Sequence, residues 1–264
     1  MLRGLYNATT AMQVETARLN AIANNIANAE TTGYKKDKMV SQSFPDVLVA
    51  RIGNKAGAVI RPFDIIGSIN HGVHVDQVKT DWFQGPLQQT DNTTDLALTG
   101  NGFFVLRVGE GENDYRYTRD GAFAVDADGY LVNQNGYRVQ GYDNQNEFVD
   151  ILVGNERFSV DPAGDIYTDQ QQYAGTIAVE DFENRDDALE KAGDNLYVVY
   201  DPEQYQSHPV GTGIKQGHIE VSNVDINKEI TDMMEVYRHY ESAQRIVSML
   251  DQTLDKTVNE VGRV

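Results

Sequence analysis

The side chains with the greatest chemical potential in this sequence are five histidines and a large surplus of carboxylates. The histidines stand at positions 71, 74, 208, 218 and 239. His71 and His74 beside Asp76 are of the types that bind zinc. They lie in a segment typical of a strand, where residues three apart point to opposite faces, so the pair cannot share a metal. We therefore expect no metal site there.

Two acidic pairs, Asp126/Asp128 and Asp161/Asp165, suggest calcium. Neither has the ligand spacing with a terminal glutamate that a calcium loop requires. Both stand close to glycine, and aspartate next to glycine is common in tight turns. We interpret both pairs as turns and expect neither a metal nor any other cofactor.

Catalytic motifs are also missing from the sequence. It contains no Gly-x-Ser-x-Gly, P-loop, His-Glu-x-x-His or dinucleotide fingerprint. The chain has no cysteine, which excludes thiol catalysis, disulfides and thiolate metal sites. We expect a protein that is not an enzyme.

The charge is strongly acidic and unevenly distributed. Against 22 basic residues stand 40 acidic ones, a net charge of −18. Residues 1–40 carry +2 and residues 223–264 carry −3, so the middle carries −17. Without clustered Lys and Arg, we expect no nucleic-acid partner. No stretch approaches 18 apolar residues, so we expect no membrane insertion. Residues 1–3 lead into an amphipathic helix, so extracytoplasmic export would proceed without a cleaved signal peptide.

Because no catalytic motif or metal site is evident, the two terminal segments carry the clearest patterns in the sequence. Near the N-terminus, apolar and small residues recur at alternating steps of three and four, the pattern of a coiled-coil seam. They are Leu2, Leu5, Thr9, Met12, Thr16, Leu19, Ala23 and Ile26. Such a helix buries too little to stand alone and needs a partner. Gly33 should end it, with Lys35 beside the negative end of its dipole.

Three asparagines near the end of this helix, Asn24, Asn25 and Asn28, are open to two interpretations. They indicate either a frayed helix end or side chains that hydrogen-bond to a neighbouring chain. Spacing alone does not decide between the two.

The C-terminal segment has a matching stripe. A capping box, Ser222 to Asp225, is expected to start the helix. The stripe comprises Ile226, Ile230, Met233, Tyr237, Tyr240, Ala243, Val247, Leu250, Leu254, Thr257 and Val261. One alternative is an amphipathic helix docked on a β domain, but the similar stripes at both ends favour pairing of the two helices.

Between the helices the sequence predicts strands. Glycines and prolines break residues 39–78 into an extended connector with one or two short strands. Residues 79–220 alternate strand-like runs with turn pairs such as Asp120-Gly121, Asp128-Gly129, Asn135-Gly136 and Ala163-Gly164, which we expect to supply positive φ angles. We predict an α+β fold with paired N- and C-terminal coiled-coil helices and a central antiparallel all-β domain. The predicted boundaries are 1–38, 39–78, 79–220 and 221–264.

Ordered sequence blocks along nearly the whole chain resemble the bacterial flagellar rod and hook protein family. The blocks are residues 23–35 (ANNIANAETTGYK), 83–87 (FQGPL), 95–104 (DLALTGNGFF), 117–123 (YTRDGAF), 129–137 (GYLVNQNGY), 222–225 (SNVD) and 259–263 (NEVGR). Ala29-Glu30 and Thr93-Thr94 depart from residues usual in the family. This affects which rod paralogue the chain resembles.

The resemblance implies a structural subunit of the flagellar basal-body rod, of the distal or proximal type. It would assemble with itself and other axial proteins after transport by the flagellar export apparatus. The expected assembly interface comprises Leu2, Leu5, Met12, Leu19, Ala23, Asn24, Asn25, Ile26, Asn28, Ile230, Met233, Tyr237, Tyr240, Val247, Leu250 and Leu254. The alternative is a secreted binding module whose β domain recognises a carbohydrate or protein ligand.

Overall fold

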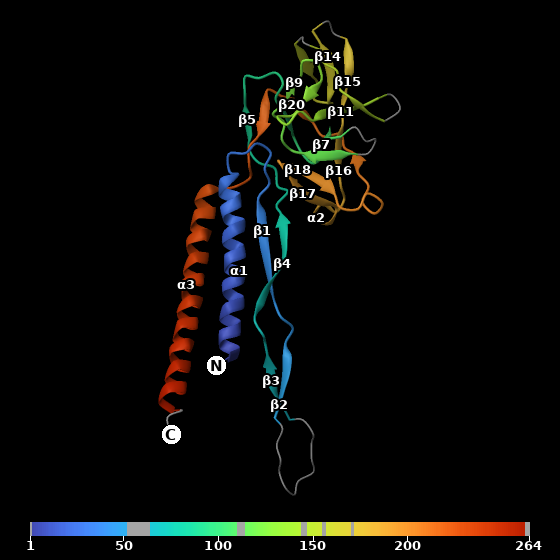
Figure 1. Cartoon of the computed structure of the whole chain (residues 1–264). Coiled ribbons are helices and arrows are strands. Elements are labelled where there is room, and N and C mark those ends of the chain that lie inside the picture. Colours follow the sequence, from blue (N-terminus) through green and yellow to red (C-terminus); the bar gives the residue numbers. More distant parts are fainter. Residues whose placement is uncertain are drawn as a thin grey trace. The chain divides into compact units, whose positions relative to one another are not determined.

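The structure, a computed structural model, describes residues 2–51, 64–109, 114–143, 147–154, 157–169 and 172–261. The chain divides into two compact units. Unit 1 comprises residues 1–26, 37–79 and 226–264, and unit 2 comprises residues 27–36 and 80–225. An N-terminal helix, a C-terminal helix and a central antiparallel sheet domain confirm the predicted α+β class (Figure 1).

Unit 1 contains the two long helices and two strand pairs. Its elements are α1 (Leu2–Ala27), β1 (Asp37–Ser43), β2 (Val47–Arg51), β3 (Asp64–Ile69), β4 (Val73–Thr80), α3 (Ile226–Lys256) and the π-helical turn η1 (Thr257–Val261). Strand β1 pairs with β4, and β2 pairs with β3. The described part of residues 39–78 thus contains four strands where the sequence suggested one or two, because the strands form two pairs. The run Ala58-Val59-Ile60, which the sequence suggested as a strand, lies outside the described residues. None of the described helices is long and apolar enough to cross a membrane.

Helix α1 ends earlier than the sequence suggested. It stops at Ala27, six residues before Gly33. Asn25 accounts for much of this end, because its side-chain amide donates to Asp37 O at 2.9 Å and its oxygen accepts from Asp37 N at 2.9 Å. Gly33 has a positive φ of 66°, but in the turn that follows the helix.

Helix α3 begins at Ile226, so Asp225 takes the position that the sequence assigned to Ser222. Ser222 is buried and its hydroxyl accepts from Val224 N at 3.3 Å. Its side chain therefore stabilises the loop before the helix.

The two long helices of unit 1 contact each other and run in opposite directions. Asn25 Nδ2 donates to Glu229 Oε2 at 3.3 Å, and Glu15 Oε1 lies 3.8 Å from His239 Nδ1. A methyl group built on Gly4 would lie 3.4 Å from Leu250 Cδ1. Across these three contacts the residue number increases along α1 and decreases by the same interval along α3. The two helices are therefore antiparallel, as can be followed in Figure 1.

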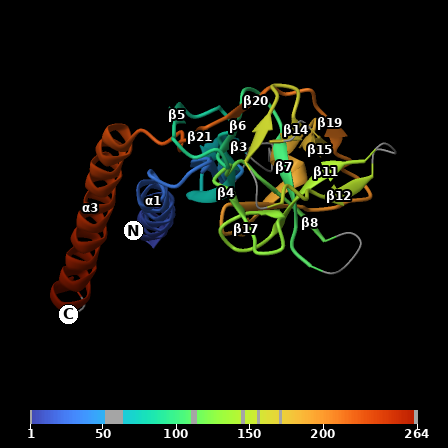
Figure 2. The same ribbon diagram turned by 90° about the horizontal axis from the view of Figure 1, so that it is seen from above.

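Unit 2 is an antiparallel sheet domain built from short strands. Its elements are β5 (Leu87–Gln89), β6 (Leu96–Leu98), β7 (Phe103–Arg107), β8 (Tyr115–Thr118), β9 (Ala124–Val125), β10 (Leu131–Val132), β11 (Arg138–Tyr142), β12 (Phe148–Asp150), β13 (Phe158–Val160), β14 (Asp165–Thr168), β15 (Tyr173–Ile177), β16 (Val179–Asp181), α2 (Arg185–Ala188), β17 (Leu189–Gly193), β18 (Leu196–Val199), β19 (His208–Pro209), β20 (Ile214–Gln216) and β21 (His218–Glu220). The main path runs β13-β14-β15-β11-β7-β8-β18-β17. Figure 2 shows some of these strands, among them β14, β15, β11 and β7, from above. Separately, β20 pairs with β6 and β21 with β5.

Strand β7 lies at the centre of unit 2 because both of its faces are apolar. Phe104 and Leu106 pack into one buried cluster with Leu131 and Ile166. Phe103 and Val105 pack into a second cluster, which contains Tyr117, Phe182 and Tyr197. Alternating side chains of one strand thus supply both cores of the domain.

The predicted turn glycines serve two different purposes. Gly129, Gly136 and Gly164 have φ angles of 86°, 81° and 95°, as expected of Asp-Gly and related turns. Gly121 is not among the positive-φ glycines. It is needed because any Cβ there would overlap the carbonyl oxygen of Leu96, whose amide donates to Gly121 O at 2.9 Å.

Candidate functional site

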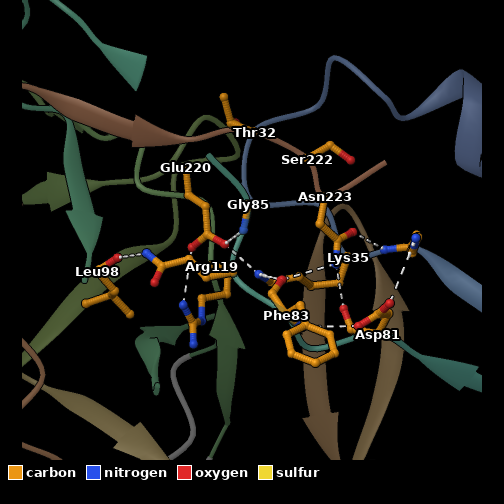
Figure 3. Close-up of polar contacts among 12 residues, drawn as sticks. Thr32, Lys35, Asp81, Phe83, Gly85, Leu98, Arg119, Glu220, Ser222 and Asn223 are labelled. Carbon is orange, nitrogen blue, oxygen red and sulfur yellow. Dashed lines mark hydrogen bonds and ion pairs between the residues drawn. The ribbon is translucent and has the colours of Figure 1, made fainter. Parts of the chain in front are cut away.

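A lysine, an arginine and one glutamate are buried together in unit 2 (Figure 3). Lys35 Nζ lies 2.5 Å from Glu220 Oε1, and Arg119 Nη1 lies 3.2 Å from Glu220 Oε2. Their exposed fractions are 1%, 3% and 1% for Lys35, Arg119 and Glu220. We call these three residues the junction cluster.

Backbone groups add hydrogen bonds to the junction cluster, although the buried Nε of Arg119 has no hydrogen-bond partner among the described residues. Gly85 N donates to Glu220 Oε1 at 2.9 Å, and Lys35 Nζ donates to Phe83 O at 2.8 Å. A side chain at position 85 would collide with the backbone of Val221. Glycine is therefore required where the chain approaches the carboxylate.

The three charged side chains come from distant parts of the sequence. Glu220 is the last residue of β21 and pairs with Leu87 of β5. Arg119 directly follows β8, and Lys35 lies in the loop after α1. The junction cluster thus joins residues 27–36, by which the chain first passes through unit 2, to the segments by which it later enters and leaves that unit.

Asn223 connects the same segments through their backbones. Its Oδ1 accepts from Lys36 N at 2.8 Å, while its Nδ2 donates to Asp81 O at 2.7 Å and to Phe83 O at 3.1 Å. Lys36 Nζ also lies 3.9 Å from Asp81 Oδ2. One amide side chain therefore links its own segment to two others that are remote in sequence, one at Lys36 and one at Asp81 to Phe83 (Figure 3).

The turn before Lys35 is hydrogen-bonded to the sheet domain at Thr32 and Gly33. Thr32 Oγ1 donates to Asp120 Oδ1 at 2.6 Å, and Thr32 O accepts from Asn195 Nδ2 at 2.5 Å. Gly33 N donates to Glu220 O at 2.7 Å. A Cβ at Gly33 would lie 2.5 Å from the carbonyl carbon of Arg119, so only glycine fits this turn.

Burial controls the electrostatics of the junction cluster. Burial lowers the pKa of Lys35 and of Arg119, and Glu220 only partly offsets this in each case. One carboxylate balances two cations, so the cluster depends on Glu220 more than on either partner. Burial also raises the pKa of the neighbouring Asp120 carboxyl. Both buried cations are ion-paired with Glu220, an arrangement that suits an anchor of the backbone better than a reactive centre.

The candidate metal ligands show no metal-binding arrangement. His71 is exposed, and the ring of His74 lies 4.7 Å from that of Phe44. Across the described ranges, no three His, Asp or Glu side chains come close enough to hold an ion.

The residues expected at an assembly interface lie in several environments. Half-buried are Leu5, Met12, Leu19, Ile26, Asn28, Met233, Tyr240, Val247, Leu250 and Leu254. Exposed are Ala23, Asn24, Ile230 and Tyr237, whereas Asn25 is buried. The side chain of Leu2 lies outside the described residues. On the α1 side, Glu15 and Asn25 make polar contacts with α3, and Gly4 lies near Leu250.

Sequence reasoning missed the junction cluster. Glu220 is one of 40 acidic residues and marked only a domain boundary. Lys35 was assigned to the dipole of a helix that ends eight residues earlier. The available signal was that Lys35, Gly85 and Arg119 fall in three of the sequence blocks that carried the family resemblance.

Comparison with known proteins gives a consistent result along the chain. Residues 5–35 match the family described as flagella basal body rod protein, residues 97–172 the flagellar hook protein FlgE/F/G D1 domain, and residues 215–260 the flagellar basal body rod FlgEFG protein C-terminal region. The flagellar hook-basal body complex protein FlhO of Bacillus subtilis is 34% identical over 100% of both chains. The chain belongs to the flagellar basal-body rod and hook protein family.

Other relatives are rod and hook proteins. The flagellar basal-body rod protein FlgG of Bacillus subtilis is 32% identical over 98% of this chain and 99% of its own. The flagellar hook protein FlgE of Borreliella burgdorferi is 39% identical over 54% of this chain and 31% of its own. The predicted family is thus confirmed, with a structural role in the flagellum. Neither protein is described as binding a carbohydrate.

Proposed function

We propose that this chain is a structural subunit of the flagellar basal-body rod that polymerises through its terminal helices. The observation that carries the proposal is its similarity, over the full length of both chains, to rod and hook-basal body proteins. The helices supply what a polymer needs, because they keep apolar side chains at the surface of the single subunit. Ile230 and Tyr237 are 45% and 55% exposed.

The helices of one subunit would pair as an antiparallel coiled coil. The contacts at Gly4, Glu15 and Asn25 support this, since they follow one side of α1 at constant register with α3. Leu5, Met12, Leu19 and Ile26 belong to the predicted stripe of α1 and are only half-buried in the single subunit. This second stripe would be left for a neighbouring subunit.

Such a stripe would meet a different surface on the next copy. A contact of this kind, repeated without closing a ring, produces a helical filament. A layer of paired helices is stiff along its axis and is suited to transmitting torque. We propose that the subunit contacts copies of itself and other axial proteins in this way.

The same proposal covers transport and chemistry. The subunit would leave the cytoplasm through the flagellar export apparatus and would have no enzymatic activity. Its absence of cysteine suits a chain that travels unfolded and works where disulfides form.

A substitution on the exposed face of α3 tests assembly separately from folding. Ile230→Asp places a charge where a neighbouring helix would pack, which costs several kcal/mol when the contact forms. We expect loss of motility in cells that depend on this chain, with unchanged unfolding of the purified subunit. Thr231→Asp, the adjacent exposed position, is the matched control and should preserve motility. Normal motility with Ile230→Asp would contradict the proposal.

A further inference from the structure

Phe83 is the most exposed of the large apolar residues that the structure describes, at 79%. It lies between β4 and β5, and its backbone oxygen accepts from Lys35 of the junction cluster. An aromatic ring left in water gives up much of the free energy that burial would provide, since such side chains bury about 150–250 Å² each. The position therefore suggests a binding role.

The backbone that presents Phe83 is rigid. Its oxygen also accepts from Asn223 Nδ2 at 3.1 Å, and Gly85 N is held by Glu220 at 2.9 Å. On either side, Trp82 Nε1 donates to Asp186 Oδ1 at 2.7 Å and Gln84 Nε2 donates to Leu98 O at 2.6 Å. Little conformational entropy is lost when a group fixed in this way binds a partner. Figure 3 shows Phe83 beside the junction cluster that holds it.

Unit 2 also has an open cleft with an aromatic lining. Its volume is about 910 Å³. Aromatic and aliphatic residues line it beside polar ones: the first are Tyr115, Tyr117, Phe182, Val198, Val199, Pro202 and Tyr205, and the second are Arg116, Asp201, Glu203, Gln206 and Ser207. A cleft of this size and lining is typical of sites that accept an apolar group.

We propose that Phe83 of one subunit inserts into this aromatic cleft of a neighbouring copy. The inference rests on the proposed function, because a rod subunit is surrounded by copies of itself. The Phe83 side chain and the cleft lie at different places on unit 2. The contact therefore joins two different surfaces, is heterologous and can repeat along a filament.

Charge opposes broad contact between copies and leaves room only for a small apolar one. The middle of the chain carries −17, so two copies of unit 2 repel each other over most of their surfaces. A small apolar contact stabilises association without bringing more carboxylates together. A basic partner would instead be selected by the acidic surface and would not need Phe83.

Site-specific crosslinking in the full chain tests the contact. A photoreactive benzoylphenylalanine replaces Phe83, and crosslinked dimers are digested and mapped. We expect peptides that contain residues 115–117, 182 or 198–207. The same probe at Tyr173, an aromatic residue that is 55% exposed, is the control and should not label the cleft. No crosslink, or a crosslink to another surface or to a different protein, would overturn the inference.

A double-mutant cycle gives an independent measure. Phe83→Ala and Tyr205→Ala should each weaken self-association about 30-fold, the loss typical of an interface anchor. The double variant should be little weaker than either single variant, because both remove the same contact. If the natural chain self-associates and Phe83→Ala leaves its affinity unchanged, only this inference fails. If the natural chain does not self-associate at all, the proposed function fails with it.

Discussion

Replacing Glu220 with glutamine tests the role of the junction cluster most directly. The substitution preserves the shape of the side chain but leaves two buried cations, Lys35 and Arg119, without a carboxylate. Removing one partner of a buried ion pair costs about 3–5 kcal/mol. The total stability of a domain is about 5–15 kcal/mol, so Glu220→Gln should remove a large part of the stability of unit 2.

Lys35→Met should be much milder. It leaves Glu220 facing Arg119 at 3.2 Å and Gly85 N at 2.9 Å, so we expect a loss of about 1–3 kcal/mol. In the Glu220→Gln background the same Lys35→Met change removes an uncompensated cation. It should therefore raise the free energy of unfolding there, the reverse of its effect in the natural chain.

The chain contains its own reporter for this experiment. Trp82, the single tryptophan, packs against Phe103 and Tyr197 with ring centroids 5.5 and 5.1 Å away. Its fluorescence during urea denaturation of the full chain follows unit 2, and a loss of 3–5 kcal/mol lowers the midpoint by about 2 M. Glu190→Gln, at an exposed position of β17, is the control. The reasoning is refuted if Glu220→Gln costs no more than Lys35→Met, or if Lys35→Met fails to recover stability in the glutamine background.

Three further substitutions test local features of the structure. Gly121→Ala should destabilise unit 2 by several kcal/mol in the same Trp82 assay, because the new methyl overlaps Leu96 O in a packed interior; Gly211→Ala, in open space, should change it little. Asp120→Asn should raise the free energy of unfolding at neutral pH, because burial raises the pKa of Asp120 in the folded state and so penalises its charged form. That gain should vanish as pH falls through the raised pKa, where the folded carboxyl is already neutral; a gain that persists at low pH would contradict the assignment. Asn25→Ala should speed hydrogen exchange at the Asp37 amide, which now donates to Asn25 Oδ1 at 2.9 Å, and equal exchange in both proteins would show that this bond does not protect it.

The sequence predicted the elements of this fold better than their contacts. Strand-like runs between turn pairs indicated the antiparallel sheet of unit 2, because strand composition and turn chemistry are local properties. The contacts of Glu15 and Asn25 with α3 involve polar side chains, which a count of apolar residues along one helix does not single out.

The junction cluster could not be predicted for a different reason. Lys35, Arg119 and Glu220 are separated by 84 to 185 residues, and no local periodicity reports contacts over such distances. Gly121 is a second case in which a long-range contact could not be predicted. The pair Asp120-Gly121 suggested a turn with a positive φ angle. The actual constraint is the backbone of Leu96, which only the folded structure brings close.

The position of Glu220 so late in the sequence has a consequence for biosynthesis. Ribosomes extend a chain from its N-terminus, so a nascent chain that reaches only residue 219 already contains Lys35 and Arg119 but not the carboxylate that neutralises them. It also lacks the last residue of β21, which pairs with β5. Burying the two cations at that stage would be costly, so the junction cluster cannot form until β21 has been made. Residues 27–36 are therefore fixed to the sheet domain only when synthesis of unit 2 is almost complete.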